Sequence, residues 1–441
     1  MSDPNPSPRP WRTAALWLSF LGPGFFLVYG LCNWYASQLP DVPSFYYSWE
    51  RSIPFVPALI LPYFSIDVFF AVSLFVCRDR GELRRHAYRI IAAIMISALG
   101  FVFSPLKFAF DRPVVDGVNG FFFGLLDGFD KPFNQAPSLH VSLLLILWAR
   151  YATHLAGPWR WLLHGWFVLI GMSIFFVYQH HVVDIWSGFM VGAVCLYAWP
   201  DAPIQWNGFA LTLESQRRRL GACYLTASGL LVVLAVTLQS WAWSLLWPAG
   251  SLLLVALAYF GAGPAVFQKL NGRHSWPARC LLAPYLLGAW ISYRCFTHGR
   301  SASEEVVAGL HLGRLPRRGE IKQLKTAAVL DLTAEFSSCR GSDRIAYLNI
   351  PLLDLAVPEA AALRAAVEFI DEQILLRPVY VHCALGLSRS AAVVAAWLVR
   401  TQRVSDAHAA LCQLREIRPG VTWSPAHIAA ITAAADGDER K

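Results

Sequence analysis

The chain divides into a long region of apolar runs and a shorter region in which apolar and polar residues alternate. Up to about residue 265, apolar runs are separated by short polar segments. A run of about twenty apolar residues matches the hydrocarbon thickness of a bilayer. We therefore predict a polytopic α-helical membrane bundle of about eight spans. They are expected near 13–35, 55–76, 90–110, 139–151 (extending to about 155), 161–178, 182–199, 220–238 and 244–261.

Residues 281–293 are apolar but too few to cross a bilayer. A helix of this length measures about 20 Å, against a hydrocarbon core of about 30 Å. Pro284 and Gly288 also interrupt the run. The pattern predicts a helix that lies at the interface and links the bundle to the next domain.

From about residue 301 the pattern is typical of a soluble α/β domain. Strands are expected at 307–312, 327–332 and 379–381, and a helix at 359–376. Ser405 and Ser424 are predicted to cap two further helices. The expected organisation is a 1–12 tail, a 13–200 membrane domain, a 201–265 pair of additional transmembrane helices, a 266–300 linker, a 301–435 α/β domain and a disordered 436–441 tail.

Composition supports the membrane class. The chain is 56% hydrophobic and only 15% charged, and its 18 Trp residues suit the interfacial belts of a bundle. The net charge of +8 comes from basic residues between apolar runs, which argues against nucleic acid as a partner. Nine cysteines occur without a C-x-x-C pair or zinc spacing, so neither a disulfide framework nor a metal or cofactor is expected. The oligomeric state stays open.

The basic residues also predict an orientation. On an eight-span path they fall on one side, which the positive-inside rule makes cytoplasmic. We therefore expect an integral membrane protein, typical of a bacterial inner membrane, with its N-terminus and its α/β domain in the cytoplasm. Lys269, Arg273 and Arg279 are expected on that side too. The other residues used are Arg9, Arg12, Arg78, Arg80, Arg84, Arg85, Arg89, Arg150, Arg160, Arg217, Arg218 and Arg219.

A candidate nucleophile lies between the strand 379–381 and a helix beginning near Ala391. Backbone N–H groups of residues 384–389, Gly386 and Ser388 among them, can surround one anion there, and the helix N-terminus adds positive potential. The same field favours the thiolate of Cys383, which can attack phosphorus. Arg389 can bind two phosphate oxygens, and Ser390 can hydrogen-bond the sulfur as it leaves. The competing interpretation is a buried structural cysteine.

These residues resemble the cysteine-dependent protein tyrosine phosphatase superfamily, whose core is His-Cys, five residues, then Arg-Ser. The likeness covers roughly 309–431 and is greatest to the dual-specificity group. In that group an Asp about thirty residues upstream protonates the leaving oxygen, which implies Asp354 rather than Asp331. The surrounding residues look like the mitochondrial branch that dephosphorylates phosphatidylglycerophosphate. Ala384 and Leu387 stand where several lipid-directed relatives carry Lys or Arg, which disfavours a highly phosphorylated head group.

A second polar cluster is expected at membrane depth, on the face opposite the arginine-rich loops. His180 and Asp184 are one helical turn apart, so Asp184 can hold the ring while its other nitrogen attacks phosphorus. His140 could protonate the leaving group. A metal is disfavoured by neighbouring cations, and the histidines could instead be packing residues. His181 is expected to be interfacial, and His154 and His164 structural. The remaining members, expected to bind phosphate, are Lys107, Arg112 and Ser138.

This cluster resembles the type 2 phosphatidic acid phosphatase superfamily over roughly 55–200, which implies a six-helix core. Pro137-Ser138-Leu139-His140 and Gln179 through Asp184 look closest to its inositolphosphotransferase-like branch. Leu139 and Ile174 depart from the pattern, where relatives carry Gly and a phosphate-binding Arg. Only four residues, rather than six, separate Lys107 from Arg112.

Together these features predict a bifunctional enzyme for lipid phosphates. An extracytoplasmic histidine site would carry phosphatase or phosphotransferase chemistry, and a cytoplasmic cysteine site would hydrolyse a phosphomonoester. Membrane lipids and a phospholipid phosphate or phosphoprotein substrate are the expected partners. The main alternative is a signalling phosphatase acting on phosphoproteins, with the bundle as anchor or lipid sensor. A second alternative is an inactive domain on a membrane scaffold.

Overall fold

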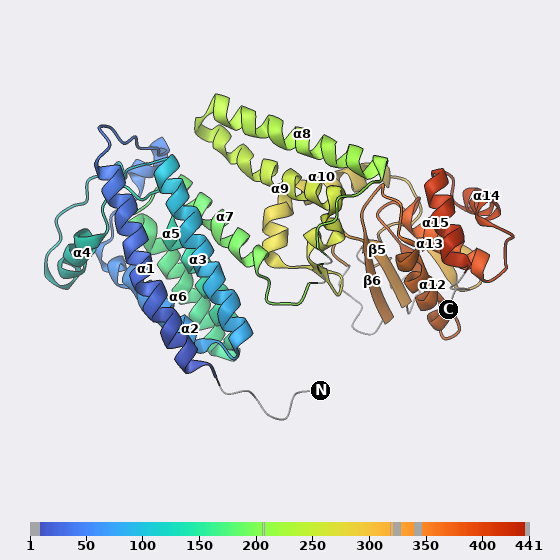
Figure 1. The fold of residues 1–441 in the computed structure, drawn as a ribbon, viewed down its shortest axis with the longest axis horizontal. Coiled ribbons are helices and arrows are strands. Elements are labelled where there is room, and N and C mark those ends of the chain that lie inside the picture. Colours follow the sequence, from blue (N-terminus) through green and yellow to red (C-terminus); the bar gives the residue numbers. More distant parts are fainter. Residues whose placement is uncertain are drawn as a thin grey trace. The chain divides into compact units, whose positions relative to one another are not determined.

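The computed structural model describes residues 9–204, 206, 208–317, 319–320, 328–338 and 346–436. The chain forms two compact units, residues 1–203 and 204–441, each described here by itself (Figure 1). Residues 1–8 of the expected N-terminal tail and 437–441 of the expected disordered tail lie outside the described residues.

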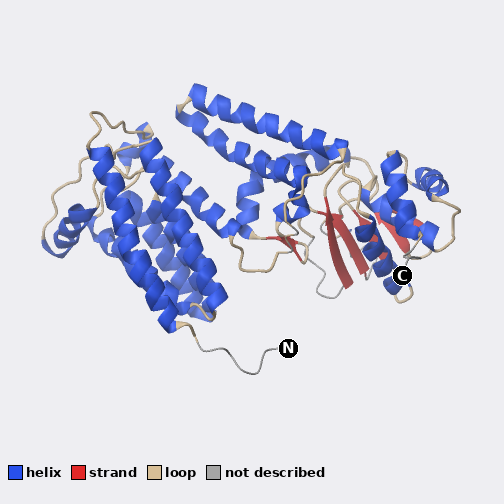
Figure 2. Cartoon of the chain, viewed as in Figure 1, coloured by secondary structure: helices blue, strands red, loops and turns tan. Residues whose placement is uncertain are grey.

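The first unit is a helical bundle (Figure 2), and α5 is its most extensively packed helix. This helix packs against α2, α3, α6 and α7, and its Ile146 and Leu147 are completely buried. By contrast, α1 exposes large apolar side chains such as Leu16 and Phe20, at 70% and 65%. The helices are α1 (Trp11–Ser37), η1 (Ser48–Ser52), η2 (Pro57–Leu59), α2 (Ile60–Val76), α3 (Arg80–Phe103), α4 (Gly117–Phe129), α5 (Leu139–His154), α6 (Gly157–Phe176) and α7 (Val182–Ala198).

Fewer helices reach spanning length than the apolar runs predict. Among the described residues, six are long and apolar enough to cross a membrane, rather than eight. The expected fourth and sixth spans, α5 and α7, have only 16 and 17 residues. The six are Trp11–Ser37, Pro57–Val76, Arg80–Phe103, Gly157–Phe176, Ser215–Leu238 and Trp241–Phe267.

The third span also differs from its predicted position of 90–110. It begins ten residues earlier, at Arg80, because the Asp79 side chain accepts a hydrogen bond from the Glu82 N–H and caps the helix. It ends at Phe103, since Pro105 disfavours helix at the residue before it. The amphipathic helix α4 was not predicted.

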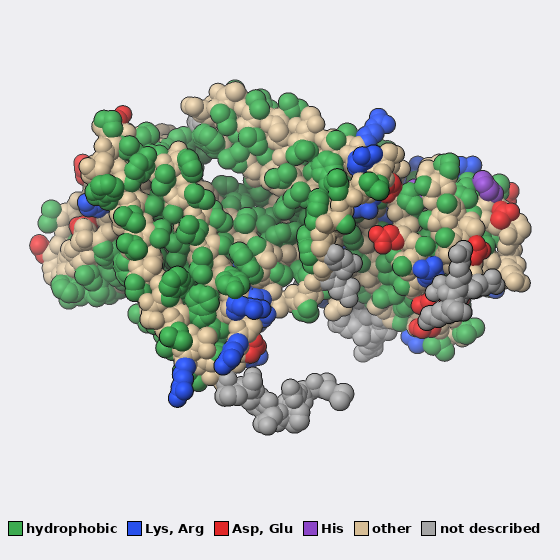
Figure 3. Space-filling view, in the orientation of Figure 1, with side chains coloured by type: hydrophobic (Ala, Val, Ile, Leu, Met, Phe, Trp, Pro, Cys, Tyr) green, Lys and Arg blue, Asp and Glu red, His purple; other side chains and the backbone are tan. Residues whose placement is uncertain are grey.

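Buried arginines tie α3 and α5 to the turn that follows α7, at one end of the first unit. Arg150 and Arg89, each 1% exposed, share the carboxylate of Asp201 at 2.9 and 3.1 Å. Arg150 also pairs with Glu82, whose carboxylate lies 2.8 Å from His154. Figure 3 shows Lys and Arg side chains at the end of this unit where α1 begins, while apolar side chains cover the helix flanks. Buried charges of this kind need such partners to offset their desolvation.

The second unit opens with an antiparallel pair of apolar helices, α8 (Ser215–Leu238) and α9 (Leu246–Leu257), joined by η3 (Ser240–Leu245). Helix α9 packs against α10 (Trp276–Phe296), which has 21 residues instead of the 13 expected. Ser275 caps α10 and Pro277 occupies its first turn, so the helix starts before the apolar run. Between them lie η4 (Ala258–Ala262), η5 (Gly263–Phe267), β1 (Lys269–Leu270) and β2 (Arg273–His274).

A five-stranded sheet of order β3-β4-β7-β5-β6 follows. Only β3 and β4 are antiparallel, so the carboxyl ends of β4, β7 and β5 meet at one edge. Residues 391–398 of α13 are wholly buried beside β7. The elements are β3 (Ser303–Val307), β4 (Leu310–Gly313), β5 (Ala328–Thr333), β6 (Ala346–Leu352), α12 (Ala360–Ile374), β7 (Val379–His382), α13 (Arg389–Arg400), α14 (Ala407–Ile417) and α15 (Pro425–Ala435).

The two predicted caps have different outcomes. Ser424 precedes α15 and its hydroxyl lies 2.9 Å from the Nδ1 of His427 in a capping box, as expected. Helix α14 is capped by Asp406 rather than Ser405, because its carboxylate accepts the Ala409 N–H at 2.9 Å. A carboxylate at this position also interacts favourably with the helix dipole.

Candidate active site

Cys383 lies in the turn between β7 and α13, as predicted. It is only 3% exposed, because β7 is the central strand of the sheet. Two donors point at its sulfur: the Gly386 N–H at 3.3 Å and the Ser390 hydroxyl at 3.2 Å. Both stabilise negative charge on sulfur. Ser390 therefore lies where it can hydrogen-bond the sulfur as it leaves, the role predicted for it.

Gly386 allows this turn to approach the neighbouring strand. Its φ is +76°, a conformation that residues with a Cβ rarely adopt. A Cβ at this position would lie 2.6 Å from the Gly313 carbonyl carbon. A side chain here would push the turn away from β4.

Arg389 is held from two sides. Its Nη2 and Nη1 lie 2.7 and 2.9 Å from the two carboxylate oxygens of Glu335, and Nη1 also donates to the Leu352 carbonyl. Nη2 lies 2.9 Å from Asp354 Oδ1. Within the described part of the chain, its Nε has no hydrogen-bond partner and remains available for a phosphate oxygen.

The pKa values of the two carboxylates beside Arg389 are shifted in opposite directions. Burial would raise the pKa of Glu335, but its pair with Arg389 lowers it overall. Burial raises the pKa of Asp354, and the neighbouring Glu335 adds to this while Arg389 opposes it. The Asp354 side chain is still 44% exposed. Asp354 thus lies at the mouth of the site with an increased tendency to hold a proton.

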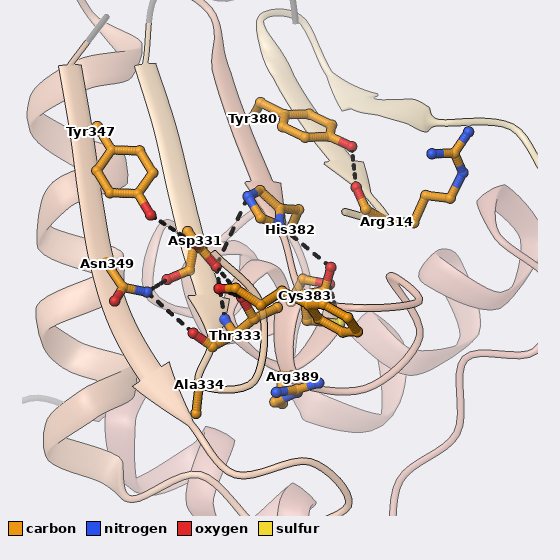
Figure 4. Close-up of polar contacts among 12 residues, drawn as sticks. Arg314, Asp331, Thr333, Ala334, Tyr347, Asn349, Tyr380, His382, Cys383 and Arg389 are labelled. Atoms are coloured by element: carbon orange, nitrogen blue, oxygen red, sulfur yellow. Dashed lines mark hydrogen bonds and ion pairs between the residues drawn. The ribbon is translucent and has the colours of Figure 1, made fainter. Parts of the chain in front are cut away.

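Asp331 instead holds strands together (Figure 4). Its carboxylate accepts from Lys269 at 2.8 Å, from Tyr347 at 2.6 Å and from the Thr333 N–H at 2.9 Å. Burial would raise its pKa, but Lys269 and His382 lower it. Asp331 is completely buried, which agrees with a structural rather than an acidic role.

Lys269 is buried beside the sheet. Its side chain is 0% exposed and bonds Asp331, the Thr333 carbonyl and the Thr333 hydroxyl. The segment between the apolar helices and α10 therefore belongs to the interior beside the sheet. A buried ammonium with three partners is satisfied where it lies.

In the first unit, four residues of the predicted histidine cluster come together. His140 and His180 line one cavity of about 60 Å³, and His180 Nδ1 lies 3.7 Å from Asp184 Oδ2. The Ser138 N–H donates to the Asp184 carbonyl at 3.0 Å. The His140 ring stacks on Tyr63 at 4.3 Å.

The two predicted phosphate-binding cations are placed differently. Arg112 pairs with Asp127 at 2.7 Å and lies within electrostatic range of Asp130, which also lines the cavity. Lys107 is exposed. Ile174, at the position of the missing arginine, is completely buried in an apolar cluster. Negative charge at Asp67 and Asp130 in the cavity wall would have to be offset before a phosphate could enter.

The other histidines of this unit are held by structural bonds. His181 is not interfacial as expected: it is 2% exposed, with Nδ1 2.9 Å from Glu50 and Nε2 accepting the Ala109 N–H. His154 pairs with Glu82. His164 accepts the Trp148 indole N–H at 2.7 Å, so both have the structural role expected.

Comparison with known proteins concerns the second unit. Residues 313–436 match the family model described as dual specificity phosphatase, catalytic domain. The chain is 31% identical over 165 residues to the human Phosphatidylglycerophosphatase and protein-tyrosine phosphatase 1, which covers 32% of this chain and 81% of that protein. The chain belongs to the dual-specificity phosphatase family. Its dual-specificity phosphatase domain is cysteine-dependent, of the class that hydrolyses phosphoric monoesters.

Other proteins are similar to part of this chain. The chain is 32% identical over 126 residues to the Arabidopsis thaliana Phosphatidylglycerophosphate phosphatase PTPMT2, covering 26% of this chain and about half (55%) of that protein. The structure of PTPMT1 is 26% identical, covers 30% of this chain and 94% of its own, and has a TM-score of 0.28. The active form of Tk-PTP is 21% identical, covers 31% and 99%, and has a TM-score of 0.29.

Sequence reasoning missed one residue of the dual-specificity phosphatase site, Glu335. A signal was available, because Glu335 follows β5, and the carboxyl ends of β5 and β7 share an edge of the sheet. Its role in fixing Arg389 depends on that strand order. The cysteine motif was visible because its residues are contiguous.

Proposed function

We propose that this chain is a multi-pass membrane phosphatase whose cysteine site hydrolyses a phosphomonoester carried by a membrane phospholipid. The observation that carries the proposal is the placement of Arg389 beside Cys383, with Asp354 at 2.9 Å, in a unit that also contains two span-length apolar helices. Both curated relatives are named for phosphatidylglycerophosphate hydrolysis. We infer that class of substrate for this chain.

The reaction takes two displacements at phosphorus. Cys383 Sγ attacks and forms an S–P bond while the P–O bond to the lipid breaks, and Asp354 gives its proton to the leaving oxygen. Arg389 and the turn amides bind the equatorial oxygens. Water then attacks phosphorus and gives a proton back to Asp354, and the S–P bond breaks. The Ser390 hydroxyl stabilises the departing sulfur, and inorganic phosphate leaves.

The neutral turn residues support a substrate with one phosphomonoester and few further charges. Ala384 is 6% exposed and Leu387 is partly buried against the domain core, so neither adds a cation to the rim. Phosphatidylglycerophosphate carries one terminal phosphomonoester. A polyphosphorylated head group would lack basic partners at these positions.

We further propose that this domain faces the cytoplasm of a bacterium. Support comes from the arginines that gather at one end of the first unit and from the need of Cys383 for a reducing compartment. Modification of an added cysteine at the C-terminus by a membrane-impermeant reagent, in intact and lysed cells, tests this. Labelling in intact cells would contradict it.

A direct assay separates lipid from protein substrates. The full chain in lipid nanodiscs is given phosphatidylglycerophosphate in the same bilayer or soluble phosphotyrosine peptides, and phosphate release is measured. The proposal expects a higher kcat/KM for the lipid and loss of both activities in Cys383→Ser. A strong preference for the peptides would instead support the signalling alternative.

A second function is favoured by His140 and His180, which line one cavity, and by Asp184, which lies 3.7 Å from His180 and accepts the Ser138 N–H through its backbone carbonyl. We propose that the first unit carries an extracytoplasmic phosphatase or phosphotransferase site. There, Asp184 orients His180 for attack on phosphorus and His140 protonates the leaving oxygen. Arg112 would need to exchange Asp127 for the substrate phosphate. Lys107 is the other expected phosphate ligand.

A further inference from the structure

The apolar helices of the second unit contact the loop that carries Asp354. Tyr259 lies just after α9, in the π-helical turn Ala258–Ala262, and is 2% exposed. Its hydroxyl donates to the backbone carbonyl of Asp354 at 2.8 Å. A residue within a span-length segment, Trp241–Phe267, therefore bonds the backbone of the proposed acid.

This hydrogen bond falls on a strained peptide. The Asp354 carbonyl belongs to the peptide that joins Asp354 to Leu355, and Leu355 has a φ of +56°. A branched side chain disfavours that left-handed conformation, so the surroundings must hold it. The N–H of the same peptide, at Leu355, hydrogen-bonds the Asp354 carboxylate, so rotation of this peptide would remove a contact that orients the carboxyl group. The Tyr259 bond opposes that rotation.

The same loop borders a cavity on one side, although its Leu353 and Ala356 are only 6% and 7% exposed. The residues around Asp354 line a cavity of about 610 Å³, and Leu355 is 53% exposed. The wall also includes Leu352 at the end of β6, Leu353 and Ala356 of the loop, and Gly261 to Ala265. With few atoms filling this side, the position of the loop depends more on its specific bonds.

The phenol of Tyr259 is itself held by two other helices. Its ring stacks on Tyr224 of α8 at 5.6 Å and 27°. The ring of Tyr224 meets Tyr285 of α10 edge to face at 5.9 Å. All three phenols lie within electrostatic range of Glu335 and Asp354. Figure 1 shows α8, α9 and α10 as neighbouring helices.

We propose that Tyr259 is a positioning residue for Asp354, so that proton donation at the cysteine site depends on the apolar helices of this unit. This inference rests on the proposed phosphatase function, in which the Asp354 proton goes to the leaving lipid oxygen. Tyr259 takes no part in the bonds that form and break. It holds the peptide that aims the carboxyl group.

The test compares two leaving groups in the full chain in nanodiscs. The leaving group of phosphatidylglycerophosphate is a lipid alkoxide, which needs the proton. The leaving group of 4-nitrophenyl phosphate is 4-nitrophenolate, which is stable without one. Tyr259→Phe keeps the ring and removes one hydrogen bond. Such a bond corresponds to about a fivefold change in rate, so kcat for the lipid should fall about fivefold. The aryl phosphate should change less than about twofold.

Three variants complete the experiment. Tyr285→Phe removes a phenol of the same cluster, and both rates should stay within about twofold of the parent. Asp354→Asn should show the same selective loss as Tyr259→Phe, but larger, and Cys383→Ser should abolish both activities. Equal loss on the two substrates in Tyr259→Phe, or no loss, would overturn the inference. If Asp354→Asn instead lowered the rates on the lipid and on the aryl phosphate equally, Asp354 would not be the acid.

Discussion

Glu335 binds Arg389 through both carboxylate oxygens, at 2.7 and 2.9 Å, in a buried pair beside the nucleophile. Removing one partner of such a pair leaves a buried charge uncompensated and costs about 3–5 kcal/mol. We expect the loss of stability in Glu335→Gln to lie near the lower end of this range, because an amide oxygen can still accept one hydrogen bond. The variant should also have a lower kcat/KM. Thermal unfolding and phosphate release measure the two effects.

The same pair predicts how stability depends on pH. The folded pKa of Glu335 lies below its usual value near 4.5, because the effect of Arg389 exceeds that of burial. The stability contributed by the carboxylate is therefore present above pH 4.5 and is lost as pH falls through the lower folded pKa. The difference between parent and Glu335→Gln should shrink in that acidic range. Glu359→Gln, at an exposed glutamate, is the control and should follow the parent throughout.

Asp354 predicts the alkaline side of the activity profile. Burial, followed by Glu335, raises its folded pKa, so the proton needed by the leaving group persists to higher pH than on a free aspartate. Activity toward the lipid should fall as pH rises through that pKa. Asp354→Asn should remove this limb and lower the maximal rate by about a hundredfold or more. If activity of Asp354→Asn still fell over the same alkaline pH range, the fall would be due to another titrating group.

Ser390 should act mainly in the second step. Its hydroxyl lies 3.2 Å from the Cys383 sulfur, where it stabilises sulfur as the leaving group. We expect Ser390→Ala to slow breakdown of the phosphocysteine about tenfold, the loss of one charge-assisted hydrogen bond. Rapid acid quench would then trap more phosphorylated protein than in the parent. A reduced trapped fraction with unchanged kcat would contradict this order of steps.

Lys269 should be essential for the stability of the dual-specificity phosphatase domain. Lys269→Met would leave the buried Asp331 carboxylate without its cation and cost about 3–5 kcal/mol. Arg273→Met, at an exposed position of the same hairpin, should change stability by less than about 0.5 kcal/mol. Denaturant unfolding of both variants measures the contrast. Similar values would place Lys269 outside the interior.

His180→Ala should separate the two proposed sites. The variant removes the proposed nucleophile of the first unit and leaves Cys383 and its surroundings unaltered. Lipid profiles of cells carrying His180→Ala or Cys383→Ser should show different phospholipids accumulating. Phosphate release from phosphatidylglycerophosphate by purified His180→Ala should match that of the parent. An unchanged lipid profile in His180→Ala would favour the anchor interpretation of the bundle.

The sequence predicted the parts of the fold that depend on neighbouring residues. The turn around Cys383 joins a β-prone strand to an alanine-rich helix, and its chemistry follows from spacing alone. Glu335, Lys269 and Tyr259 reach the site from distant segments, so their roles depend on strand order and helix packing. The bounds of α5 and α7 were predicted to within one residue, but at 16 and 17 residues both helices are shorter than the six of spanning length.

The depth of the nucleophile has a practical consequence for chemical proteomics. Cys383 is 3% exposed, while Cys295 and Cys412, which lie outside the span-length helices, are exposed. Small electrophiles such as iodoacetamide will therefore report first on surface thiols, and a labelled band by itself will say nothing about occupancy of the catalytic sulfur. A probe with a tetrahedral oxyanion group would instead bind to the turn amides beside Cys383. Competition by orthovanadate would then identify the adduct formed on Cys383.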